Sequence, residues 1–116
     1  MKKLIIAACL LCTPAVAAQP LSPDRAAEKA VSILTGDPYG NSKSEVLSGI
    51  DGQMLIVKGI DPCSKTRIKS PLWVFHVTAT DRNSTDASGK PSKIDGFLSL
   101  NATSGQMVCA GLPFLD

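Results

Sequence analysis

The chain has no surplus of either charge after its first 18 residues. Residues 19–116 contain ten basic and ten acidic residues, because Lys2 and Lys3 lie in the first 18. A nucleic-acid-binding domain needs an excess of lysine and arginine facing phosphates, so this balance argues against one. It argues equally against a polybasic protein that binds a membrane surface. An apolar content of 44% is too high for a disordered chain and predicts a folded domain.

The residues that usually carry catalysis or bind metals are also scarce. His76 is the only histidine, and only two of the four cysteines follow residue 18. Structural zinc sites need four ligands, and these three side chains are too few. Glycine-rich phosphate-binding loops are missing, so we predict neither a metal nor a cofactor. The five aromatic residues must also serve both the core and any ligand pocket.

The first 18 residues have the three-part layout of a secretory signal. A positive start is followed by nine apolar residues (4–12), Pro14 and the small residues 15–18. Nine residues cannot cross a hydrocarbon core that needs about 20 in a helix. A lipoprotein cleavage box at Cys9 would leave an apolar region shorter than usual. We therefore expect a signal peptide over 1–18, cut after Ala18 or Ala17, and a bacterial periplasmic or secreted protein without membrane insertion.

The two remaining cysteines, Cys63 and Cys109, predict one disulfide bond. Export places the pair in an oxidising compartment, where an even number of cysteines favours a bridge. The alternative is a thiol enzyme in which one cysteine is a nucleophile paired with His76.

An amphipathic helix is predicted near the start of residues 19–116. Ser22 is a suitable N-cap and Pro23 a suitable first helical residue. An apolar stripe follows at helical spacing, and Gly36 ends the helix. The stripe consists of Ala27, Ala30, Val31 and Leu34.

A series of strands is predicted after the helix. Residues 45–50 and 53–60 flank Asp51-Gly52, which is typical of a hairpin turn. Residues 53–57 are apolar on both faces and predict a central strand. Residues 72–80 alternate, with Trp73, Phe75, Val77 and Ala79 on one face and His76 on the other.

The last third of the chain predicts a long loop and two further strands. Residues 81–93 are polar and are expected to form an exposed loop. Residues 94–101 and 106–109 are expected to be strands joined by a turn at 102–105. These elements predict one α+β domain over 19–116, with the helix packed on an antiparallel β-meander. Four aromatic residues are expected between helix and sheet: Trp73, Phe75, Phe97 and Phe114.

Three segments resemble the PepSY family of small exported domains, which are similar to part of metallopeptidase propeptides. The family's Ala-Ala-x-x-Ala helix corresponds to residues 26–30, and its Trp-x-Val strand to residues 73–77. Its closing hairpin corresponds to residues 100–108, with Asn101 where an aspartate is usual. The resemblance implies a PepSY-like or cystatin-like fold and protein binding, in some members inhibition of a peptidase, without catalysis.

These observations predict a non-catalytic binding module whose partner is another exported protein, with no nucleic acid involved. The partner would be a peptidase or hydrolase that the module inhibits or modulates, bound through an exposed sheet edge or the loop at 81–93. A small-ligand carrier with a pocket between helix and sheet is the alternative. His76 is interpreted as structural, and the aspartates Asp24, Asp51, Asp61 and Asp95 as lacking a motif. The expected contact residues are Lys65, Arg67, Lys69, Arg82 and Lys90.

Overall fold

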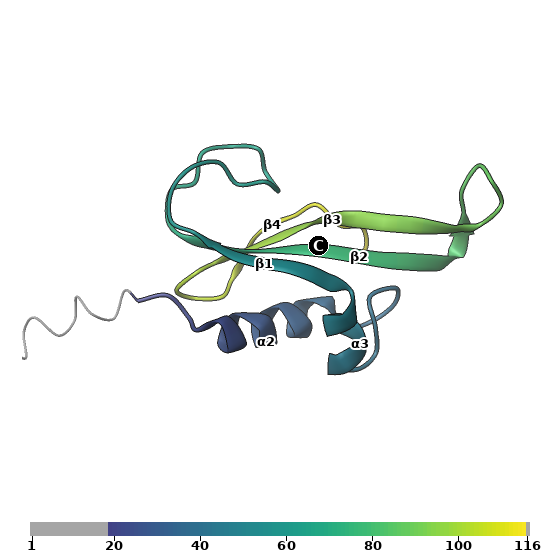
Figure 1. Cartoon of the computed structure of the whole chain (residues 1–116), viewed down its shortest axis with the longest axis horizontal. Helices are drawn as coiled ribbons and strands as arrows, with labels where there is room; N and C mark the ends of the chain where they lie inside the picture. The colour runs from purple at the N-terminus through teal and green to yellow at the C-terminus, as the bar shows by residue number, and fades with distance from the viewer. Residues whose placement is uncertain (1–18, 116) are drawn as a thin grey trace, which may run out of the picture.

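The computed structural model describes residues 19–115, so the predicted signal peptide and its cleavage site lie outside the described residues. Within the described residues, two helices and four strands are joined by loops in an α+β arrangement, as predicted (Figure 1). The elements are α2 (Pro23–Leu34), α3 (Lys43–Ser48), β1 (Ile50–Ile56), β2 (Leu72–Thr85), β3 (Pro91–Asn101) and β4 (Met107–Ala110). Neighbouring strands pair antiparallel in the order β1-β2-β3-β4.

Helix α2 begins where the sequence predicts. The Ser22 hydroxyl accepts a hydrogen bond from the Arg25 N–H at 3.2 Å, and Pro23 is the first helical residue. The fully buried positions are Ala26, Ala30 and Leu34, so the buried stripe begins one residue before the predicted Ala27. The short side chains of Ala26 and Ala30 allow the first turns of the helix to approach neighbouring elements closely.

The predicted hairpin turn at Asp51-Gly52 is wrong. Residues 43–48 form helix α3, and Asp51 and Gly52 lie inside β1, where the pairing with β2 is irregular. The cause is a capping arrangement: the Ser42 hydroxyl accepts from the Glu45 N–H, and the Glu45 carboxylate accepts from the Asn41 N–H. These bonds satisfy free donors at the helix start, so a helix forms where a strand was expected.

Two further predictions about strands are corrected. Residues 53–57 do not form a central strand, because within residues 19–115 β1 is the outermost strand of the sheet and pairs only with β2. The predicted loop at 81–93 is instead a long hairpin, in which Thr80 pairs with Lys93 and Asp81 with Ser92. The Asp86 carboxylate accepts hydrogen bonds from the Ser88 and Lys90 N–H groups and so closes the turn. The serine and threonine side chains of this hairpin can be exposed to solvent on both of its faces.

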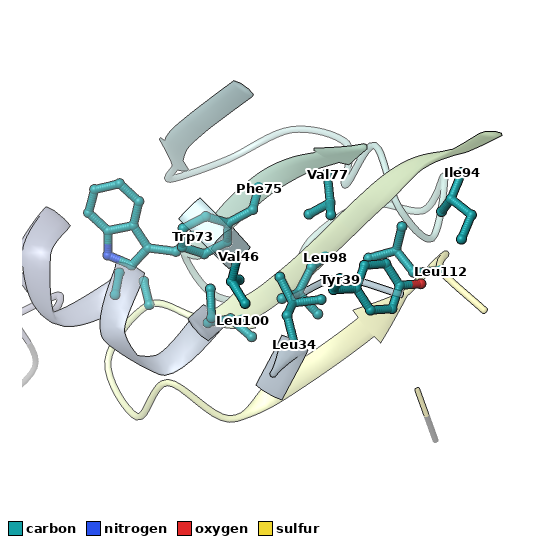
Figure 2. Close-up of a cluster of buried hydrophobic side chains, with 13 residues drawn as sticks. Leu34, Tyr39, Val46, Trp73, Phe75, Val77, Ile94, Leu98, Leu100 and Leu112 are labelled. Carbon is teal, nitrogen blue, oxygen red and sulfur yellow. The ribbon is translucent and has the colours of Figure 1, made fainter. Parts of the chain in front are cut away.

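The core lies between the helices and one face of the sheet. Buried side chains from both helices, β2 and β3 gather in one cluster (Figure 2). Trp73 and Phe75 belong to it, as predicted, but Phe114 is 67% exposed. Phe97 pairs with His76 on the opposite face of the sheet. Tyr39 occupies the core instead, and its hydroxyl donates to the Pro113 carbonyl at 2.5 Å.

Candidate functional site

A basic arm (residues 58–70) connects β1 to β2 at one end of the sheet, opposite the tip of the β2–β3 hairpin (Figure 1). The arm folds back on itself, with Ile60 bridged to Arg67. The Ile68 N–H donates to the Gly59 carbonyl at 2.9 Å, and the Asp61 N–H donates to the Thr66 carbonyl at 2.9 Å. The arm is therefore an ordered small ribbon held by backbone hydrogen bonds.

Two connections fasten the basic arm to the sheet. The predicted disulfide is present and joins Cys63 to Cys109 in β4. Asp61 is 2% exposed and accepts a hydrogen bond from the Ser99 hydroxyl in β3 at 2.6 Å. The same carboxylate accepts from the Cys63 N–H at 2.8 Å and the Ser64 hydroxyl at 3.1 Å. A buried carboxylate needs such donors, and these bonds supply them.

His76 lies on the face of the sheet opposite α2 and is held by two carboxylates. Its Nδ1 contacts Asp51 in β1, and its Nε2 lies 2.6 Å from Asp95 in β3. The imidazole ring is also 5.1 Å from the ring of Phe97. The hydrogen bond to Asp51, followed by that to Asp95, raises the pKa of His76 above its ordinary value.

This Asp–His–Asp arrangement connects three strands, which the sequence analysis did not foresee. Asp51 belongs to this cluster and not to a turn, which corrects the earlier interpretation. Both ring nitrogens are engaged, so neither is free to ligate a metal or to accept a proton from a substrate. Among residues 19–115 no cluster of His, Cys, Asp and Glu is suited to a metal ion. A protonated His76 therefore acts chemically as an ionic clamp across β1, β2 and β3.

The clamp makes a testable prediction about pH. Protonated His76 favours the folded state, because its folded pKa lies above the unfolded value of about 6.5. The stabilisation is therefore complete below about pH 6.5 and is lost as the pH rises through the raised folded pKa. We expect a loss of about 1 kcal/mol, since both carboxylates are exposed and each pair is weak. Urea unfolding from pH 6 to 9 measures it.

The variant His76→Gln is the control for this prediction. Glutamine can hydrogen-bond the same carboxylates without a titrating charge, so its unfolding midpoint should not follow the wild-type pH dependence. If the stability of both proteins fell equally between pH 6 and 9, the pH dependence would come from groups other than His76.

The five basic residues expected to contact a partner do not form one surface. Lys65, Arg67 and Lys69 lie in the basic arm, and the last two line a cleft of about 320 Å³ beside Leu72 and Val108. Arg82 lies in β2 and Lys90 in the hairpin turn, at the other end of the sheet (Figure 1). The structure thus separates the expected contact residues into two groups.

The structure bears on both alternative functions, the thiol enzyme and the small-ligand carrier. Cys63 and Cys109 are joined, so in this oxidised form neither provides the thiolate that a Cys–His pair requires. The space between α2 and the sheet, expected to hold a ligand in a carrier, is occupied by buried side chains such as Leu34, Phe75 and Leu98. A larger cleft of about 530 Å³ lies elsewhere, between α3 and β2, and has a polar lining that includes Glu45, Asp81 and Arg82.

The free edge of β1 is apolar and exposed. Met54 is 50% exposed, Leu55 38%, and the next residue after the strand, Val57, 63%. Charged residues and proline normally protect an outer strand from pairing. The edge from Gln53 to Val57 has neither. Sequence reasoning identified this segment as apolar but assigned it to the sheet interior.

Comparisons with family models, with curated proteins and with solved structures find no match. The PepSY-like assignment accordingly stays a prediction. In residues 19–115 no helix has the length and apolar character needed to span a membrane.

Proposed function

We propose that this protein is a non-catalytic binding module that takes an extended segment of another exported protein as an additional strand along β1. The observation that carries the proposal is the unprotected free edge from Gln53 to Val57. An unpaired strand edge offers a row of backbone donors and acceptors to a second chain. Exposed apolar side chains beside that row add contact area and select the partner's side chains.

The opposite edge of the sheet supports the choice of β1. Strand β4 has only four residues, and its Cys109 is tied to the basic arm. Short edge strands recruit a partner poorly, because few backbone hydrogen bonds can form. Strand β1 has seven residues, which matches the usual length of a strand in a sheet.

The edge can be tested with a displayed library of random peptides about 10 residues long, a length that covers one strand. The pool selected on the disulfide-bonded protein is then measured against the double variant Met54→Lys and Val57→Lys. Both residues are exposed, so the fold should tolerate lysine, which protects natural edge strands from pairing. We expect the affinity of the selected peptides for this double variant to be lower than for the wild type by about tenfold or more.

The matched control is the double variant Met107→Lys and Phe114→Lys. It places the same charges on exposed apolar residues of β4 and the segment after it, away from β1 and from the cleft beside Arg67, and should bind the pool like the wild type. Equal binding by the β1 variant, or a library that yields no binder, would contradict strand addition. Sedimentation without peptide separates this function from pairing of β1 with a second copy.

A further inference from the structure

The basic arm concentrates positive charge on a chain that is otherwise acidic. Its 13 positions include four basic residues, Lys58, Lys65, Arg67 and Lys69, and one acidic residue, Asp61. The rest of residues 19–115 contains six basic and eight acidic residues. The overall neutrality of residues 19–116 therefore conceals a separation of charge, with the positive part at one end of the sheet.

No carboxylate in the described chain neutralises these four basic side chains. Asp61 is buried, and its oxygens accept hydrogen bonds from Ser99, Cys63 and Ser64. The ion pairs found within residues 19–115 are those of His76 with Asp51 and Asp95. All four basic residues of the arm are exposed. Their charge is available to a partner and attracts an anionic one.

The arm is also fixed in place before a partner arrives. The disulfide to β4, the Asp61–Ser99 hydrogen bond and the Ile60–Arg67 bridge define its position. A preorganised cationic surface loses less conformational entropy on binding than a flexible one. Ser70 lines the cleft beside Arg67 and Lys69, and its hydroxyl adds a donor for a carboxylate oxygen next to these charges.

The free edge of β1 ends where the basic arm begins. Ile56 ends β1 opposite Leu72, the first residue of β2, and Lys58 follows two residues later. A strand added along β1 and continued past Val57 would therefore meet Lys58 first, and its continuation would cross the arm to reach Arg67 and Lys69, which lie beside Val108 of β4. Such a partner would first present apolar side chains to Met54 and Leu55 and then meet positive charge.

We infer that the segment bound at β1 is an extended peptide with an apolar run flanked on one side by several acidic residues, which bind the basic arm. The acidic residues precede the apolar run if the peptide runs antiparallel to β1, and follow it if it runs parallel. This inference rests on the proposed strand addition and adds the partner's chemistry to it. Charge complementarity sets the orientation of the peptide on the edge.

The test uses the same peptide pool and the triple variant Lys65→Glu, Arg67→Glu and Lys69→Glu. We expect the wild-type pool to be enriched in Asp and Glu at one end of an apolar run. Individual peptides from the pool are then synthesised. Their affinity for the triple variant should be about tenfold lower than for the wild type, and their affinity for the wild type should decline with added salt. Thermal unfolding confirms that the variant folds, since the three side chains are exposed and make no ion pair within the described chain.

The matched control reverses three basic residues at the other end of the sheet, Arg82→Glu, Lys90→Glu and Lys93→Glu. The change in net charge is the same, so unchanged binding by this control assigns the effect to the arm. If both triple variants lost the same affinity for the peptides, the effect would come from net charge alone, and the inference would be overturned. A pool without acidic enrichment that still needs the β1 edge would also overturn it and leave strand addition standing. Loss only in the arm variant, with the β1 variant unaffected, would instead overturn strand addition.

Discussion

Replacing both Cys63 and Cys109 by serine is expected to lower the free energy of unfolding by about 4 kcal/mol. The bridge spans 46 positions, and a closed loop of that length removes much of the conformational entropy of the unfolded chain. Denaturant unfolding of the double variant measures the loss against the wild type. Because small domains have a total stability of about 5–15 kcal/mol, the variant should unfold at a much lower denaturant concentration.

Reduction of the wild-type protein is the control for the serine substitutions. Reduced wild type and the double variant should unfold at similar denaturant concentrations, because both lack the same covalent connection. A loss below about 1 kcal/mol would mean that the bridge constrains the unfolded chain little. Reduction should also loosen the basic arm, since Cys63 fastens it to β4. Binding of acidic peptides is therefore expected to weaken on reduction.

The features that sequence predicted correctly depend on local signals or on simple counting. The start of α2 follows from Ser22 and Pro23, whose roles involve only their immediate neighbours. The Cys63–Cys109 bridge follows from an even pair of cysteines behind an expected signal peptide. The turn before β4 is likewise local, with the Asn101 side chain accepting from the Thr103 and Ser104 N–H groups.

The missed helix α3 was also signalled locally, by Ser42 and Glu45, whereas the other errors concern which segment lies beside which. Residues 53–57 are apolar enough for a central strand, but the basic arm carries the chain away, and its return places β2 on only one side of β1. The sequence pattern measures hydrophobicity and not the number of neighbouring strands. The same apolar run that misled the prediction is the basis of the proposed docking edge.

The His76 cluster could have been found by one more step of reasoning. If residues 72–80 and 94–101 pair as a hairpin, Asp95 falls opposite Thr78 and on the same face as His76. The polar composition of residues 81–93 hid this pairing, because it was attributed to a loop. Asp51 could not be placed in the same way, since its position depends on an irregular pairing between β1 and β2. Asp61 gave no signal, as its burial depends on the distant Ser99.

Asp61→Ala is expected to lower the free energy of unfolding by about 3 kcal/mol. The change removes the acceptor of the Ser99 hydroxyl, of the Cys63 N–H and of the Ser64 hydroxyl. Buried donors left without a partner account for most of the loss. Urea unfolding measures it, with the exposed Glu28→Ala as a control that should change stability by less than about 0.5 kcal/mol.

Asp61→Asn separates the hydrogen bonds of this residue from its charge. The asparagine oxygen can still accept from Ser99 and Cys63, and its amide can donate to the Ser64 hydroxyl. We therefore expect a loss of only about 1 kcal/mol. If Asn proved as damaging as Ala, the negative charge itself would be essential in this part of the arm. In that case Asp61 would act by offsetting the repulsion among Lys58, Lys65, Arg67 and Lys69, and its effect would weaken with added salt.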